Sequence, residues 1–205
     1  AGLPKDRYYL YRSRWNTKDE TLHILPHWNW EGREGETTPV FVYTNHNSAE
    51  LFVNGKSQGI QRKDRQSKLD RYRLRWMNVK YEPGTLRVVA YDDAGRAVAE
   101  KSMVTAGKPH HIRLEADRQT IVANGDDLSY VTATIVDKNG NPCPLADNSL
   151  QFEVKGSGKF KAVCNGDATS LELFHQPTMK AFSGKLVVLV QSTTQTGAIE
   201  LTVSG

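Results

Sequence analysis

The chain has 205 residues, a length that allows one large domain or two small ones. Charged residues make up 24% of it and hydrophobic residues 38%, which excludes a long disordered chain and a collagen-like one. Two cysteines are too few for a disulfide scaffold, and no apolar run approaches the roughly 20 residues of a membrane-spanning helix, so we expect no membrane partner.

The net charge of +4 is concentrated in one segment. Residues 56–75 hold eight basic and two acidic side chains, and the rest of the chain is slightly acidic. Such a run is typical of a solvated loop beside a strand edge, with an anion or acidic-glycan site as the functional alternative. No nucleic-acid-binding motif accompanies the charge, so we expect no nucleic acid partner.

Residues 1–16 predict a short helix. Tyr8, Tyr11 and Trp15 are spaced i, i+3, i+7 and fall on one stripe of it. A helix this short is not stable alone, so the stripe needs a partner, and we expect the segment to be poorly anchored in this chain. Because the chain starts without a methionine or a signal peptide, we also expect it to be part of a longer protein.

Residues 17–106 change to a two-residue period of β-branched and aromatic side chains, which predicts strands. The expected strands are 21–25, 39–43, 49–53, 72–76, 85–91 and 97–104. Asn54-Gly55 follows the third of them and suits a two-residue hairpin, because both central residues of that turn need positive φ. This spacing of strands and turns predicts a β-sandwich.

A second series of strands begins after a short break at residues 106–109. The expected strands are 110–115, 130–136, 150–154, 159–163, 185–190 and 198–203. Thirteen of the 18 aromatic residues lie in residues 1–106, which favours two separate cores. The sequence therefore predicts an all-β protein with a helix in 1–16, one sandwich in 17–106 and a second in 107–205.

The histidines do not form a metal-binding pattern. His110 and His111 are adjacent in an expected strand and point to opposite faces. His23 and His27 have the i, i+4 spacing of a helical zinc pair, but Pro26 and the strand pattern between them prevent that geometry. We expect no metal site and no cofactor.

No catalytic constellation is recognisable either. The sequence has no nucleophile-elbow, phosphate-loop or dinucleotide-binding motif. Residues 137–141 predict a hairpin turn rather than a calcium loop, because the glycine stands at the fourth place and no glutamate closes the loop. Cys143 and Cys164 are expected to be free, with a disulfide between them as the alternative.

Several ordered motifs carry a family resemblance. They are Gly2-Leu3-Pro4-Lys5-Asp6, His23-Ile24-Leu25-Pro26-His27-Trp28-Asn29-Trp30, Ala49-Glu50-Leu51-Phe52-Val53-Asn54-Gly55-Lys56, Tyr81-Glu82-Pro83-Gly84 and Asn165-Gly166-Asp167. Together they resemble the C-terminal part of bacterial glycoside hydrolase family 2 enzymes, chiefly β-galactosidases. In that likeness residues 1–15 resemble the last helix of the catalytic barrel, and two immunoglobulin-like domains follow, the second of them invasin-like.

The resemblance implies a parent enzyme that is a retaining glycosidase acting in the periplasm or outside the cell. The family's acid/base glutamate follows an asparagine, and no Asn-Glu dipeptide occurs here, so the chain itself is expected to be non-catalytic. It would be an accessory segment that buttresses the parent's barrel, contacted through Tyr8, Tyr11 and Trp15, with a place at the border of the substrate cleft or at an oligomer interface as further expected roles. Self-association through that stripe is a further expectation, and a carbohydrate-binding or adhesive surface module is the alternative function.

The segment His27-Trp28-Asn29-Trp30 carries two hypotheses. In an extended chain Trp28 and Trp30 share one face and His27 and Asn29 the other, so the two indoles could stack on sugar rings. Alternatively the four residues seal the joint between the barrel and the first sandwich, with the polar pair satisfying backbone groups.

Overall fold

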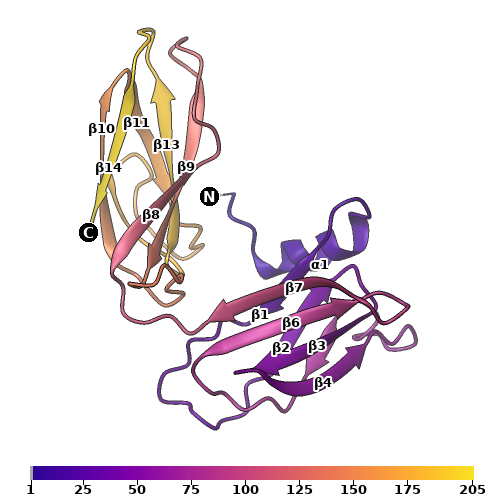
Figure 1. Ribbon diagram of the computed structural model, residues 1–205. Helices are drawn as coiled ribbons and strands as arrows, with labels where there is room; N and C mark the ends of the chain where they lie inside the picture. The colour runs from indigo at the N-terminus through magenta and orange to yellow at the C-terminus, as the bar shows by residue number, and fades with distance from the viewer. Residues whose placement is uncertain (1) are drawn as a thin grey trace. The chain divides into compact units, whose positions relative to one another are not determined.

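The computed structural model describes residues 2–205 and contains two compact units, residues 4–105 and residues 106–205. Each unit is an immunoglobulin-like β-sandwich with its own hydrophobic core, and one short helix precedes the strands of the first (Figure 1). The all-β prediction of two tandem sandwiches after a helix is confirmed. The helix belongs to the first unit, and the second unit begins one residue earlier than the sequence pattern suggested.

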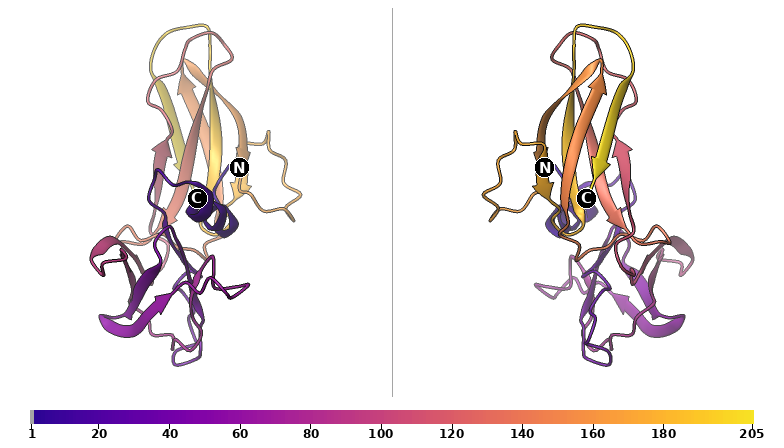
Figure 2. Two further views of the ribbon diagram at one scale, coloured as in Figure 1. Left: turned by 90° about the vertical axis from the view of Figure 1, so that its right-hand side faces the viewer. Right: turned by 90° about the vertical axis from the view of Figure 1, so that its left-hand side faces the viewer.

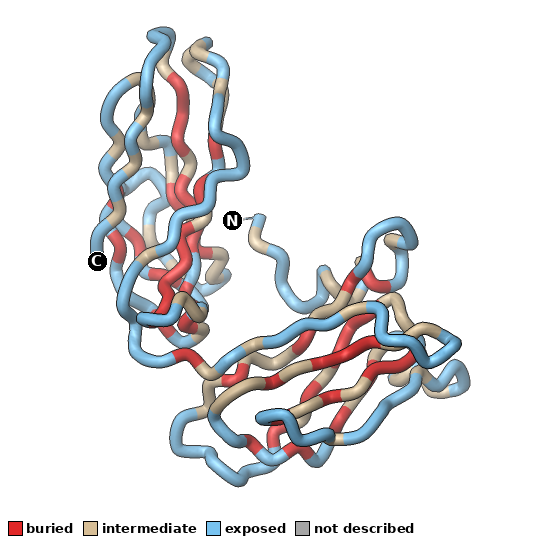
Figure 3. Tube along the Cα trace, viewed as in Figure 1, coloured by how far each residue is buried: buried red, intermediate tan, exposed pale blue. Residues whose placement is uncertain are grey.

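The first unit consists of helix α1 and seven strands. Their bounds are α1 Asp6–Trp15, β1 Leu22–Leu25, β2 Val40–Thr44, β3 Ser48–Val53, β4 Lys56–Arg62, β5 Leu74–Trp76, β6 Thr85–Tyr91 and β7 Ala97–Val104. All pairings are antiparallel, in one sheet ordered β1-β2-β5 and another ordered β4-β3-β6-β7. Side chains that alternate along β2, β3 and β6 meet between the two sheets, where Val42, Leu51 and Val88 are fully buried. Figure 3 shows how buried and less buried positions are distributed along the chain.

The hairpin between β3 and β4 forms as the sequence predicts. Asn54 and Gly55 both have positive φ, at 50° and 81°. The Asn54 side chain also reaches the neighbouring β6, where its Oδ1 accepts from the Thr85 N–H at 2.8 Å and its Nδ2 donates to the Pro83 carbonyl at 3.1 Å. Gly84 lies against this amide so closely that an added Cβ would stand 2.0 Å from Asn54 Oδ1. Glycine at position 84 is therefore required by the packing as well as by its φ of 134°.

The sequence pattern missed strand β4. Its residues are almost all exposed and, apart from Gly59 and Ile60, polar, because β4 is the edge strand of its sheet. No alternation of apolar and polar side chains marks such a strand. The loop at residues 63–73 then leads to the short strand β5, so part of the basic run is an exposed loop and an edge, as predicted.

The second unit also has seven strands in two sheets. Their bounds are β8 His111–Ala116, β9 Leu128–Val136, β10 Ser149–Gly156, β11 Gly158–Cys164, β12 Thr178–Lys180, β13 Lys185–Ser192 and β14 Ile199–Ser204. One sheet is ordered β11-β13-β9-β8 and the other β12-β10-β14, and residues such as Leu150, Leu186 and Val188 fill the core between them. In Figure 2 the loop at residues 165–177 projects from this sandwich, and Leu171 in it is 95% exposed.

Two structural details of the second unit follow the sequence expectations. Asp137 accepts hydrogen bonds from the backbone N–H groups of Gly107, Asn139 and Asn141, so residues 137–141 form a tight turn. These bonds, led by the one from Gly107, hold the pKa of Asp137 far below its usual range. Cys143 and Cys164 are both free thiols, and no disulfide joins them.

Candidate functional site

One face of helix α1 packs on the outer surface of strand β1. The Tyr9 ring stacks on the His23 imidazole with centroids 3.9 Å apart, and His23 Nε2 lies 2.7 Å from Asp6 Oδ1. Burial lowers the pKa of His23 below its usual value, and the Asp6 carboxylate counteracts part of that shift. Tyr43 points away from the core of the sandwich and yet is buried, since it lies beneath the same stack.

The end of the helix is fixed by polar contacts. Arg12 Nη1 donates to the Glu20 carbonyl at 2.9 Å and to Thr21 Oγ1 at 3.1 Å. Asn45, in the turn between β2 and β3, accepts from the Thr21 N–H at 2.5 Å and donates to the Asn16 carbonyl at 2.7 Å. The expectation of a poorly anchored helix is therefore wrong. The contacts that hold it are one ring stack and several hydrogen bonds to residues outside the helix, so the apolar periodicity of residues 1–16 does not reveal them.

The opposite face of α1 carries the aromatic stripe, which we define as Tyr8, Tyr11 and Trp15. These side chains are 52%, 45% and 74% exposed. The rings of Tyr11 and Trp15 stack with centroids 4.7 Å apart, so the i, i+4 neighbours form one continuous apolar surface. Together with Asn16 they border an open hollow of about 740 Å³. The residues expected to pack on a barrel thus stand together at the surface of this unit.

Trp28 lies in the core of the first sandwich. It is 1% exposed, its Nε1 donates to the Glu82 carbonyl at 3.0 Å, and its ring meets Tyr81 edge-on. Thr105 Oγ1 donates to the Trp28 carbonyl at 2.6 Å. The Trp28 indole is therefore not available to stack on a sugar ring, and Trp30 packs against the same core from a half-buried position.

Trp30 and His27 form a compact pair beside that core. The two rings stack with centroids 4.3 Å apart, and Trp30 Nε1 donates to the His27 carbonyl at 2.9 Å. The Asn29 N–H donates to His27 Nδ1 at 3.2 Å, and the Arg33 guanidinium lies 5.1 Å from the Trp30 ring centroid. His27, Asn29 and Trp30 are all half-buried, so a contact with another domain or with carbohydrate at these three residues stays a prediction.

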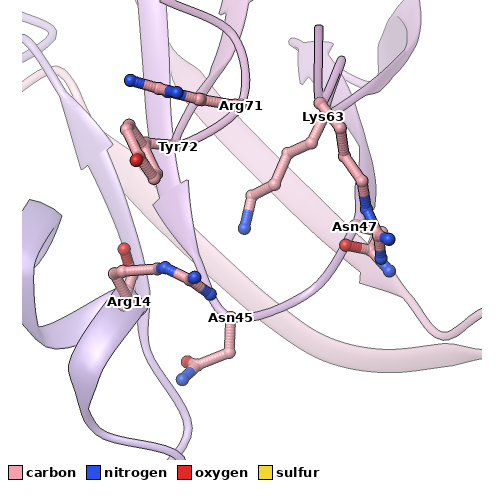
Figure 4. A pocket seen from close by; sticks show the side chains of 8 residues that line it. Arg14, Asn45, Asn47, Lys63, Arg71 and Tyr72 are labelled. Atoms are coloured by element: carbon pink, nitrogen blue, oxygen red, sulfur yellow. The ribbon is translucent and has the colours of Figure 1, made fainter.

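The basic run, for which the sequence left an anion or acidic-glycan site as the functional alternative, borders a second concave surface. We call it the basic pocket: a hollow of about 460 Å³ lined by Ser13, Arg14, Asn45, Asn47, Lys63, Arg65, Arg71 and Tyr72 (Figure 4). Arg14 comes from α1, whereas Lys63, Arg65 and Arg71 come from the loop after β4. The local excess of basic residues was the available signal. The contribution of the helix could not be seen, because Arg14 stands about 50 positions earlier in the chain.

Two further properties concern the chemistry of the described residues. Within residues 2–205, no group of three or more His, Cys, Asp or Glu side chains is arranged to hold a metal ion. In the same part of the chain, no helix has the length and apolar character that crossing a membrane requires.

Comparison with known protein families divides the chain in the same way as its fold. Residues 112–205 match the glycoside hydrolase family 2 C-terminal domain 5. Residues 35–99, within the first sandwich, match a domain of unknown function, DUF4982. Each sandwich therefore has a family match, and the match on the second sandwich names glycoside hydrolase family 2.

Individual relatives cover nearly the whole chain. Beta-galactosidase BoGH2A of Bacteroides ovatus is 47% identical over 98% of this chain and 23% of its own length. A protein of Formosa agariphila named a putative beta-glucuronidase is 33% identical over 82% of this chain and 16% of its own length. The crystal structure of a beta-glycosidase from Bacteroides vulgatus is 38% identical and superposes with a TM-score of 0.90, covering 99% of this chain and 25% of that one. The chain thus spans about a quarter or less of the length of each of these proteins.

Proposed function

This chain belongs to the C-terminal domains of glycoside hydrolase family 2, and we propose that it is a non-catalytic accessory segment that buttresses the catalytic barrel of a β-galactosidase-like enzyme. The parent's two catalytic carboxylates, which a retaining glycosidase holds about 5–5.5 Å apart, would then lie on the barrel. The location of the parent outside the cytoplasm stays a prediction from the family resemblance.

The observation that carries this proposal is the two-sided helix. One face of α1 is fixed to the first sandwich by the Tyr9–His23 stack and by the bonds of Arg12 and Asn45. The other face presents the aromatic stripe to its surroundings. Exposed clusters of tyrosine and tryptophan are enriched at the centres of protein interfaces, where they bury a large area at little cost in side-chain entropy.

Such a helix would transmit the rigidity of the sandwich to the barrel. The stack and the hydrogen bonds leave α1 few alternative orientations, so a barrel surface that buries the stripe would be held to the sandwich as well. Because the contact is aromatic rather than ionic, we expect it to tolerate salt and to add stability rather than to take part in the chemistry.

The alternative function, a carbohydrate-binding module, loses the pair of indoles on which it rested, because Trp28 is enclosed in the core. The half-buried Trp30 and His27 remain as its possible contact residues. We therefore give the buttress role precedence.

The test uses the parent enzyme with the double substitution Tyr11→Ser and Trp15→Ser. We expect a lower Tm of the whole enzyme and a nearly unchanged KM for an aryl β-galactoside. Tyr130→Ser is the matched control, since Tyr130 lies in the second sandwich and is exposed to the same extent as Tyr11. A raised KM at unchanged Tm would place the stripe at the substrate and contradict the proposal.

A separate assay addresses the absence of catalysis. The 205-residue chain should hydrolyse no aryl β-galactoside above background after rigorous purification. Turnover that disappears when one carboxylate of this chain is substituted would show that the chain has an active site of its own.

A further inference from the structure

The basic pocket gathers four cationic side chains from two distant parts of the first unit. They are Arg14 of helix α1 and Lys63, Arg65 and Arg71 of the loop after β4. Figure 4 shows the Lys63 side chain reaching toward Arg14 and Asn45, while Arg71 and Tyr72 border another side of the hollow. The fold therefore brings together charges that repel one another.

None of these four cations is paired with a carboxylate in the described part of the chain. The acidic residues beside them in sequence have other partners: Asp70 forms a two-pronged ion pair with Arg75 of β5, and Asp64 Oδ1 accepts from the Gln66 N–H at 2.8 Å. A concave surface with charges of one sign attracts counter-ions and concentrates the field within it. No carboxylate of the described residues lines the pocket, so all the charged side chains of its lining are cationic.

Lys63 is the most restrained of the four. Its ammonium donates to the Thr44 carbonyl at 2.5 Å and is largely buried, and burial together with the Arg14 charge lowers its pKa to about 8. An ammonium has three donors, so two remain after the bond to Thr44. Burying a charge without a counter-charge is costly, and a bound anion would remove that cost.

Arg71 and Tyr72 add shape to the charge. The Arg71 guanidinium lies 4.7 Å from the Tyr72 ring centroid, and the ring is still 37% exposed. A guanidinium stacked on an aromatic face is oriented in advance and can offer two parallel N–H donors to a carboxylate or sulfate. The exposed part of a tyrosine ring provides an apolar surface for the ring of a sugar.

We propose that the basic pocket binds the carboxylate or sulfate group of an acidic saccharide. A volume of about 460 Å³ exceeds what a lone carboxylate needs and falls within the usual size of small-molecule sites. The charges supply affinity for the anion, and the aromatic and amide lining gives the remainder of the sugar a surface to contact. No residue of the aromatic stripe lines this pocket, so the proposal is independent of the buttress role.

The test is a binding titration of the 205-residue chain by calorimetry. The acidic probes are digalacturonate and galactose 6-sulfate, and the reference ligands are galactose, sodium sulfate and free glutamate. We expect at least one acidic saccharide to bind about tenfold more tightly than every reference ligand, and to bind more weakly as salt is raised.

Variants then assign the binding to the pocket. Arg65→Gln with Arg71→Gln should raise the Kd of that saccharide by about tenfold or more, because two charge-assisted contacts are lost. Lys68→Gln is the matched control, since it removes one charge from the same loop outside the pocket. Tyr72→Ser should bring the Kd of the saccharide close to that of the matching reference anion, sodium sulfate or glutamate. An unchanged circular dichroism spectrum would establish that each variant is folded.

Several outcomes would overturn the proposal. They are equal affinity for galactose, no measurable binding of either acidic saccharide, and a Kd that the Arg65/Arg71 double variant leaves unchanged. Sodium sulfate bound as tightly as galactose 6-sulfate would reduce the pocket to an anion site without sugar recognition. Tighter binding of glutamate than of the saccharides would instead assign the pocket to a protein carboxylate.

Discussion

The Tyr9 ring lies almost parallel to the His23 imidazole, inclined by only 7° at a centroid distance of 3.9 Å. This stack joins the helix to the outer surface of the sheet β1-β2-β5. It also encloses a titratable ring, because His23 is half-buried beneath the helix. The attachment of α1 is therefore coupled to the protonation of one side chain.

Acid should weaken this attachment. The pKa of His23 is lowered in the folded chain, chiefly by burial and in part by Lys101, while Asp6 opposes the shift. The unfolded chain then binds the proton more readily than the folded one, so stability is lost as the pH falls through about 6.5. The free energy of unfolding, measured in urea near pH 7.5 and 5.5, should fall with the pH.

His23→Gln should flatten this dependence in part. The pKa of His27 is also lowered by burial, so His27→Gln should remove a further share. A slope that both substitutions leave unchanged would contradict the assignment to these two rings.

Trp28 should contribute more to the stability of the first sandwich than any exposed aromatic residue. Trp28→Ala empties a fully buried site and leaves the Glu82 carbonyl without its donor, for which we expect a loss of about 3–5 kcal/mol. All four tryptophans lie in the first unit, so the fluorescence change in urea follows the unfolding of this sandwich. Trp15→Ala, a control at 74% exposure, should change the free energy of unfolding by less than about 0.5 kcal/mol.

Removal of residues 1–15 should leave both sandwiches folded and still lower the Tm of the first. The deletion uncovers Tyr43 and His23, which the helix now protects from solvent. Self-association, measured by sedimentation, should decrease because the aromatic stripe is gone. The triple variant Tyr8→Ser, Tyr11→Ser and Trp15→Ser should reduce self-association as much as the deletion does, at an unchanged Tm. If the deletion instead unfolds the chain, α1 is part of the core of the first sandwich.

Lys63 should titrate below the ordinary value of a lysine. Its pKa of about 8 compares with an ordinary value of 10.5, so stability rises between these two pH values as the buried ammonium is neutralised in the folded state first. The other charged groups that line the pocket with it are Arg14, Arg65 and Arg71, all cationic. NMR of labelled lysine side chains should give a titration midpoint near pH 8 for Lys63 in the free chain. Bound galactose 6-sulfate should raise that midpoint. A Lys63 midpoint near 10.5 in the free chain would refute the burial argument.

The two cysteines should differ in reactivity. Cys164 is half-buried, whereas Cys143 is buried, and burial raises the pKa of its thiol with Asp137 adding to the shift. Because the thiolate is the reactive form, iodoacetamide should label Cys164 first and Cys143 only after unfolding. Peptide mass spectrometry at short and long labelling times distinguishes the two, and equal rates would indicate that the core around Cys143 opens readily.

Features that depend on neighbours in the chain were determined by the sequence itself. The Asn54-Gly55 hairpin follows from the positive φ that those two residues tolerate, and the aromatic stripe follows from the geometry of a single helix. The alternation of apolar side chains along strands such as β2 and β6 was likewise sufficient to predict two sandwiches, because the two-residue period of a strand is local.

Only the tertiary structure decided whether Trp28, helix α1 and the basic side chains are buried or exposed, and which groups they contact. Trp28 is buried because Glu82 and Tyr81, more than 50 positions away, meet it across the sandwich. The anchoring of α1 depends on Asn45, and the basic pocket depends on Arg14 meeting a loop about 50 residues further on. The hydrogen-bonding and charged groups in these pairs follow no periodic pattern along the chain. The pairs therefore form only when the two sheets and the helix pack together.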